Sequence, residues 1–188
     1  LNNLSLPLAV DLDGTLISTD MLHESTVGLL KVSPLSIVML PWILIIKGKA
    51  ALKDWIASKV LFDASLLPYN QDLIVWLRNQ HSSGRHLILC TASDKLIADA
   101  VAKHLGFFDE VMASNGSLNL EGCNKAKALI NKFGERGFDY AGNSSADLEV
   151  WKHSRRSIVV NASADLLNKV SAISNLEMVF EGFSSNFT

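Results

Sequence analysis

The chain has 188 residues, which is enough for one full core with an elaboration and short for two independent domains. Its 17 basic and 19 acidic residues give a formal net charge of -2, so charge makes no case for nucleic acid or an acidic surface as the main partner. Cys90 and Cys123 lack the spacing of a disulfide framework or a zinc site, and the first residues lack the pattern of a signal peptide. A reducing, cytoplasmic location is therefore expected.

Short apolar runs bounded by turn residues recur along the chain and predict β-strands. They lie at 8–12, 86–91, 110–114, 138–142, 157–161 and 177–181. From residue 86 on, these runs alternate with helical patterns, which is typical of β-α units that build a parallel sheet with helices on both faces. The fold class expected is α/β, a three-layer Rossmann-like parallel sheet.

Residues 19–83 break this alternation. They contain no convincing strand, and their helical patterns are separated by prolines and Gly48. We predict that 17–84 form a helical cap inserted after the first strand, and that 1–16 and 85–188 form the α/β core.

An apolar run from Leu35 to Ile46 lies inside this predicted cap. It spans 12 residues, fewer than the roughly 20 that a membrane crossing needs. Two interpretations remain open besides a span: a cap helix packed on its neighbours, and a surface that meets lipid or an apolar substrate tail. Pro41 should interrupt any helix here, giving two short pieces that meet near Pro41 and Trp42.

The stretch "LPLAVDLDGT", residues 6–15, places two aspartates directly after the first predicted strand. In open parallel sheets, ligands bind outside the carboxyl ends of the strands. A carboxylate pair there can hold a divalent cation, which removes the repulsion between the two charges. Asp11 can also attack a phosphoryl group, and Asp13 can protonate the leaving oxygen and later deprotonate water. Gly14 lets the backbone approach a phosphate.

Two later strand ends supply further polar groups. Thr91 ends a buried apolar run and can donate its hydroxyl to a phosphoryl oxygen, while Ser93 lies where the next helix begins. Lys125 and Lys127 open another helical pattern, and either could counter the charge on a transferring phosphoryl group. Lys125 is preferred, because it lies slightly closer to the apolar stripe of that helix.

The segments "DLDGT", "LILCT", Lys125 and "GNSSAD" match, in order, the four motifs of the haloacid dehalogenase superfamily of phosphohydrolases, over residues 8–147. The resemblance implies an aspartyl-phosphate mechanism with Mg²⁺ as cofactor, in which Asp11 is the nucleophile and Asp13 the acid and base. The site residues implied are the catalytic Asp11, Asp13, Thr91 and Lys125, the substrate-binding Gly14, Thr15, Ala92 and Ser93, and the metal ligands Asp11, Asp13 (through its carbonyl), Asn143 and Asp147.

The fourth motif departs from the family pattern, which usually has aspartate where this chain has Asn143. An amide oxygen can bind Mg²⁺ but brings no charge. Weaker metal binding is therefore expected, unless Asp147 moves into the metal shell.

Narrower resemblances suggest the context of the activity. The predicted cap resembles that of the phosphoserine-phosphatase-like branch, and "NKAKAL" with "GERGFDYAGNSSADLEVW" is similar to the hydrolase-like domain fused ahead of UbiA-type prenyltransferases. The resemblance implies a phosphomonoester hydrolase acting on a phosphorylated small molecule. Together with the apolar run in the cap, it suggests a prenyl or other lipid phosphate as substrate, at the inner face of the membrane or beside a fused membrane domain. The alternative is a catalytically weak module that binds or regulates a membrane prenyltransferase. A phosphorylatable receiver domain fits less well, because that class lacks a helical insert.

Overall fold

Six parallel strands form one sheet in the computed structural model, which describes residues 6–18, 63–115 and 119–181. The spatial order is β3-β2-β1-β4-β5-β6. The strands are β1 (Leu8–Val10), β2 (Leu87–Asp94), β3 (Glu110–Ser114), β4 (Asp139–Gly142), β5 (Arg156–Val160) and β6 (Asn175–Phe180). All six lie within two or three residues of the predicted runs, so the predicted parallel sheet is confirmed.

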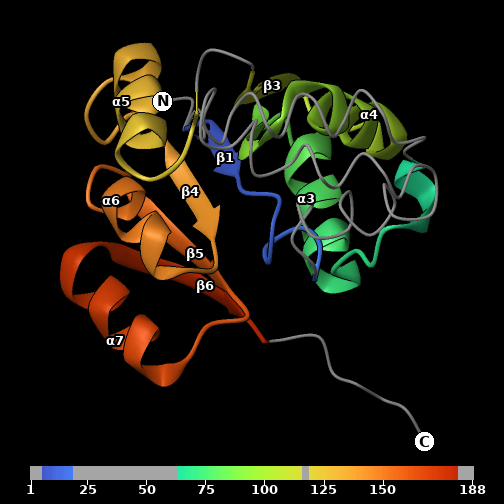
Figure 1. Cartoon of the computed structure of the whole chain (residues 1–188). Helices are drawn as coiled ribbons and strands as arrows, with labels where there is room; N and C mark the ends of the chain where they lie inside the picture. Colours follow the sequence, from blue (N-terminus) through green and yellow to red (C-terminus); the bar gives the residue numbers. More distant parts are fainter. Residues whose placement is uncertain (1–5, 19–62, 116–118, 182–188) are drawn as a thin grey trace, which may run out of the picture.

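Helices cover both faces of this sheet, as Figure 1 shows. One face carries α3 (Gln71–Ser82) and α4 (Lys95–Leu105). The other carries α5 (Cys123–Phe133), α6 (Leu148–Trp151) and α7 (Ala164–Ile173). Two 3₁₀ turns, η2 (Ala64–Leu66) and η3 (Ser145–Asp147), precede α3 and α6. The three-layer α/β architecture is therefore also confirmed.

The central strand β1 is apolar along its whole length because both faces of the sheet are covered. In β1, Leu8, Ala9 and Val10 are all fully buried. Successive side chains of a strand point to opposite faces, so Leu8 and Val10 join the cluster under α3 and α4 while Ala9 joins the cluster under α5, α6 and α7.

Helix α3 lies within the range expected for the cap, yet it packs on the sheet. Leu73, Ile74 and Leu77 belong to the same core cluster as Leu8 and Val10. The division into core and cap stays a proposal, and this packing moves the proposed end of the cap ahead of residue 71. Most of the predicted cap, including the run 35–46 and its proline, lies outside the described residues.

Strand pairing sets the geometry of the site. Val10 of β1 is in register with Leu89 of β2 on one side and with Ala141 of β4 on the other. The residues that follow these strands therefore meet at one edge of the sheet. Among the described residues, no helix is long and apolar enough to cross a membrane.

Candidate active site

Asp11 directly follows β1 and is held between the neighbouring strands. Its backbone N–H donates to the carbonyl of Ala141 in β4, at 2.9 Å. The residue is 7% exposed, and its Oδ1 accepts a 2.6 Å hydrogen bond from Nζ of Lys125. Among the described residues, Oδ2 accepts no hydrogen bond, so this oxygen is the one that can react or bind a cation.

Burial raises the pKa of Asp11 to about 7, and the carboxylates of Asp147 and Asp13 act in the same direction. The Lys125 ammonium opposes this rise. The carboxylate of Asp11 therefore needs further positive charge nearby to be fully ionised at neutral pH.

Lys125 comes from the first turn of α5 and is buried, whereas Lys127 is exposed. Burial works against its charge, but Asp11 and Asp147 raise its pKa above the ordinary value for a lysine. The structure thus brings Lys125, the preferred of the two lysines, to Asp11 as a permanent cation.

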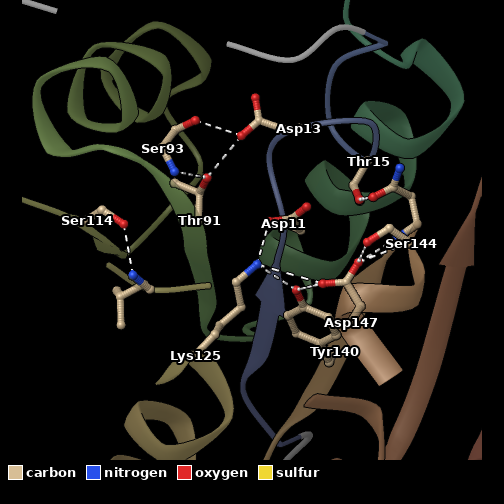
Figure 2. A network of polar contacts seen from close by, with 12 residues as sticks. Asp11, Asp13, Thr15, Thr91, Ser93, Ser114, Lys125, Tyr140, Ser144 and Asp147 are labelled. Atoms are coloured by element: carbon tan, nitrogen blue, oxygen red, sulfur yellow. Dashed lines mark hydrogen bonds and ion pairs between the residues drawn. The ribbon is translucent and has the colours of Figure 1, made fainter. Parts of the chain in front are cut away.

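Tyr140 is a member of this network that the sequence motifs do not include. Its hydroxyl accepts from Lys125 at 2.9 Å and donates to Oδ1 of Asp147 at 2.6 Å (Figure 2). Burial, reinforced by Asp147 and Asp11, raises the pKa of Tyr140 well above its usual value, so the phenol stays neutral. One feature of the sequence could have pointed to Tyr140. Its phenol lies in a strand expected to be buried on both faces, and a buried phenol needs a hydrogen-bonding partner.

Asp147 uses its other oxygen to hold the loop after β4. Oδ2 accepts from the backbone N–H of Asn143 at 3.1 Å and from the N–H and hydroxyl of Ser144, both at 3.0 Å. Both oxygens of this buried carboxylate therefore already have donors. Asp147 is placed to orient Lys125, through Tyr140, and Asn143.

The hydroxyl groups at the end of β2 point toward Asp13 (Figure 2). Ser93 Oγ donates to Oδ2 of Asp13 at 2.6 Å, and Thr91 Oγ1 lies 3.5 Å from the same oxygen. Thr91 Oγ1 also accepts from the backbone N–H of Ser93 at 2.9 Å. Ala92, half-buried, lies between these two residues. Four of the predicted residues thus come together beside the Asp11 network.

The first and fourth motifs interlock through Gly14, Thr15 and Asn143. Gly14 has φ +75°, and a Cβ there would lie 2.0 Å from Nδ2 of Asn143, so any other residue would be strained and would collide with the amide. The buried Thr15 donates its hydroxyl to Oδ1 of Asn143 at 3.3 Å. Gly14 and Thr15 therefore hold Asn143 against the first motif.

The donor chemistry of the site fits Mg²⁺, a cation that prefers carboxylate, amide and carbonyl oxygens. Asp11 offers Oδ2, Asp13 follows two residues later, and Asn143 brings an amide oxygen. Within the described part of the chain, no three His, Cys, Asp or Glu side chains form a metal-binding group by themselves. The ligands would therefore have to include an amide, a backbone carbonyl or water.

Comparisons with known proteins place this arrangement in context. No family model matches the chain. The uncharacterized protein y4nM of Sinorhizobium fredii is 39% identical over 167 residues, and the match covers 88% of this chain and 32% of that protein. The chain thus spans about a third of the length of this curated relative.

Three kinds of solved structure resemble the chain over most of its length. A protein of unknown function from Bordetella pertussis has a TM-score of 0.69 at 13% identity, covering 90% of this chain and 96% of that one. A HAD family hydrolase from Salmonella enterica has a TM-score of 0.64 at 12% identity, and the match covers 92% of this chain and 68% of that one. Phosphoserine phosphatase in its apo form has a TM-score of 0.61 at 12% identity, and as a phospho-aspartyl intermediate analogue it has a TM-score of 0.60 at 13% identity. Each match covers 94% of this chain and 93% of that one.

The fold is the one shared by these solved structures, which include a HAD family hydrolase and phosphoserine phosphatase. In this fold the loops after β1, β2 and β4 form the site described above, at the carboxyl edge of the sheet. The narrower resemblances, to the helical-cap branch and to the prenyltransferase-fused domain, stay predictions.

Proposed function

We propose that the chain is a phosphomonoester hydrolase in which Asp11 is the nucleophile. The observation that supports this most strongly is the buried Asp11 carboxylate, which pairs with Lys125 through one oxygen while its other oxygen accepts no hydrogen bond from the described residues. A fixed cation on one oxygen orients the carboxylate, and an acid two residues away can serve the leaving group.

The proposed reaction has two steps. Oδ2 of Asp11 attacks phosphorus, the bond from phosphorus to the leaving oxygen breaks, and Asp13 gives its proton to that oxygen. Water then attacks the aspartyl phosphate, Asp13 takes the proton from water, and the Asp11 carboxylate and inorganic phosphate are released. Lys125 and the Thr91 hydroxyl are proposed to stabilise the charge on the phosphoryl oxygens.

Mg²⁺ is the proposed cofactor, with Asp11, Asp13 and Asn143 as ligands. When bound, it would supply positive charge beside the phosphoryl group and beside the Asp11 carboxyl, whose pKa is raised by burial. The hydrogen bonds that Asp147 already accepts favour a role in which it holds the Asn143 loop over one as a direct ligand.

The proposed substrates are phosphorylated small molecules, a class suggested by the likeness to phosphoserine phosphatase. A prenyl or other lipid phosphate is the narrower proposal, and it depends on the apolar run 35–46.

A triple variant tests the lipid proposal. Changing Leu40, Trp42 and Ile43 together to serine should slow hydrolysis of a long-chain prenyl phosphate and spare a short soluble one. Equal losses on both substrates with a lower melting temperature would mean ordinary core packing. The findings do not favour a catalytically weak regulatory module.

A direct assay tests the function. With p-nitrophenyl phosphate and Mg²⁺ we expect hydrolysis that EDTA stops and Asp11→Asn abolishes, because the substituted side chain is not a nucleophile. Asp165→Asn is the matched control, since that carboxylate is exposed on α7 and pairs only with Lys169 among the described residues. An Asp11→Asn variant as active as the parent would refute the mechanism.

A further inference from the structure

Two carboxylates compete for the single ammonium group of Lys125. Nζ lies 2.6 Å from Oδ1 of Asp11 and 3.8 Å from Oδ1 of Asp147. The Tyr140 hydroxyl lies 2.9 Å from Nζ and 2.6 Å from the same Asp147 oxygen. The phenol therefore bridges the Lys125 ammonium and the Asp147 carboxylate, which lie too far apart for a direct hydrogen bond.

The direction of these hydrogen bonds is determined by the groups themselves. An ammonium group only donates and an ionised carboxylate only accepts. The single O–H of Tyr140 must then point to Asp147, and its lone pair must receive a proton of Lys125. This leaves one ordered chain of donors from Lys125 through Tyr140 to Asp147.

The ring of Tyr140 is held so that its oxygen cannot drift. It is fully buried and packs edge-on to Trp151, with ring centroids 6.0 Å apart at 72°. The indole Nε1 of Trp151 donates to the Tyr140 carbonyl at 3.2 Å. A Cβ on Gly142 would lie 2.8 Å from both Cε1 of Tyr140 and Cγ of Asp147, so the glycine leaves room for these two side chains to meet.

We propose that Tyr140 is a positioning residue for phosphoryl transfer, whose hydroxyl keeps the Lys125 ammonium on Asp11 and out of direct hydrogen-bond distance of Asp147. The proposal rests on the proposed function and deepens it. Without the hydroxyl, Lys125 would be drawn across the 3.8 Å gap toward Asp147, and both the nucleophile and the cation beside the phosphoryl group would lose their alignment.

The variant Tyr140→Phe removes only the bridging oxygen. With p-nitrophenyl phosphate and Mg²⁺ we expect kcat to fall about tenfold and inhibition by vanadate, a transition-state analogue, to weaken by a similar factor. KM and inhibition by inorganic phosphate should change less than about twofold, because ground-state binding does not need the aligned ammonium.

Tyr69→Phe is the matched control. It also deletes a phenol oxygen, one that donates to the Ala64 carbonyl at 2.8 Å and takes no part in the Lys125 network. It should leave kcat and vanadate inhibition as in the parent. A kcat for Tyr140→Phe within twofold of the parent would overturn the proposal, and so would a loss of kcat without weaker vanadate inhibition.

A second measurement needs no activity. The ¹⁵Nζ resonance of the Lys125 ammonium should shift in Tyr140→Phe and stay at its parental position in Tyr69→Phe, because only the first variant moves the ammonium from Asp11 toward Asp147. An unchanged resonance in Tyr140→Phe would overturn the proposal. If the parent does not hydrolyse the aryl phosphate, the proposed function fails, while this measurement still decides the role of Tyr140.

Discussion

The two aspartates of the first motif have separate sets of partners. Asp11 faces Lys125 on one side of the site, while Asp13 faces the hydroxyls of Ser93 and Thr91 on the other (Figure 2). A fixed cation suits a nucleophile, and hydroxyl donors suit a group that must exchange protons. At the scale of single residues, this division supports different roles for two identical side chains.

Ser93→Ala should lower kcat about three- to tenfold, because Asp13 loses a short 2.6 Å hydrogen bond that helps to orient its carboxylate. Steady-state kinetics with p-nitrophenyl phosphate measures the effect. Ser65→Ala is the control, since Ser65 Oγ also donates to a carboxylate, that of Asp63, at 2.7 Å but on the surface. If both variants keep the parental kcat, Ser93 does not act on Asp13.

Asn143→Asp should tighten Mg²⁺ binding by about tenfold or more, because a carboxylate adds a full charge where the amide gives a dipole. The replacement keeps the acceptor for the Thr15 hydroxyl, so the loop should retain its position. Calorimetric titration of both forms measures the affinity. Unchanged affinity would mean that Asn143 lies outside the metal shell.

The raised pKa of Asp11 predicts how stability depends on pH without metal. Burial raises this pKa from 3.8 to about 7, so between these values the folded state binds more protons than the unfolded state. Stability should therefore fall as pH rises through this window. Asp11→Asn removes the titrating group and should show a flatter dependence, with a higher melting temperature than the parent at pH 8 in EDTA. Parallel melting curves for the two proteins across pH 5 to 8 would contradict this.

At the scale of elements, helix α3 packs its apolar stripe against the sheet. Leu77 is fully buried in the cluster that also contains Leu8 and Val10, whereas Val75 on the same helix is 59% exposed. An amphipathic pattern alone does not say which surface a helix covers. Because α3 packs on the sheet, we propose that the boundary between cap and core, predicted at 85, lies ahead of residue 71.

Leu77→Ala should lower the free energy of unfolding by about 3 kcal/mol, because it leaves a cavity under the sheet. Val75→Ala, on the exposed side of α3, should change it by less than about 0.5 kcal/mol. Chemical denaturation of both variants measures the difference. Similar small effects would mean that α3 packs outside the cooperative core.

The strands and the site motifs could be predicted from the sequence because each depends on local pattern. Asp11, Thr91 and Asn143 follow apolar runs, and parallel pairing brings strand ends to one edge. The role of Tyr140 could not be predicted in this way. Its hydroxyl meets a lysine from α5 and an aspartate from η3, and only the packed structure brings the three together.

At the scale of the molecule, the two ends of the sheet carry different groups of buried polar residues. The carboxyl edge carries the candidate site, and the opposite edge carries Asp139, fully buried and bonded to the guanidinium groups of Arg85 and Arg155. These ion pairs connect β4 to residues that flank β2 and β5, at the end of the sheet opposite the candidate site. The chain spans about a third of the length of the y4nM protein, so the proposed hydrolase activity applies to this part alone.

The central claim is that a phosphoryl group passes through Asp11. The most direct test is mass spectrometry of the protein quenched in acid during turnover of p-nitrophenyl phosphate with Mg²⁺. The peptide that contains Asp11 should gain the mass of one phosphoryl group, localised to that residue, and the signal should be absent from Asp11→Asn. Turnover with no phosphorylated peptide in the parent, or with the phosphoryl group on another residue, would contradict the mechanism.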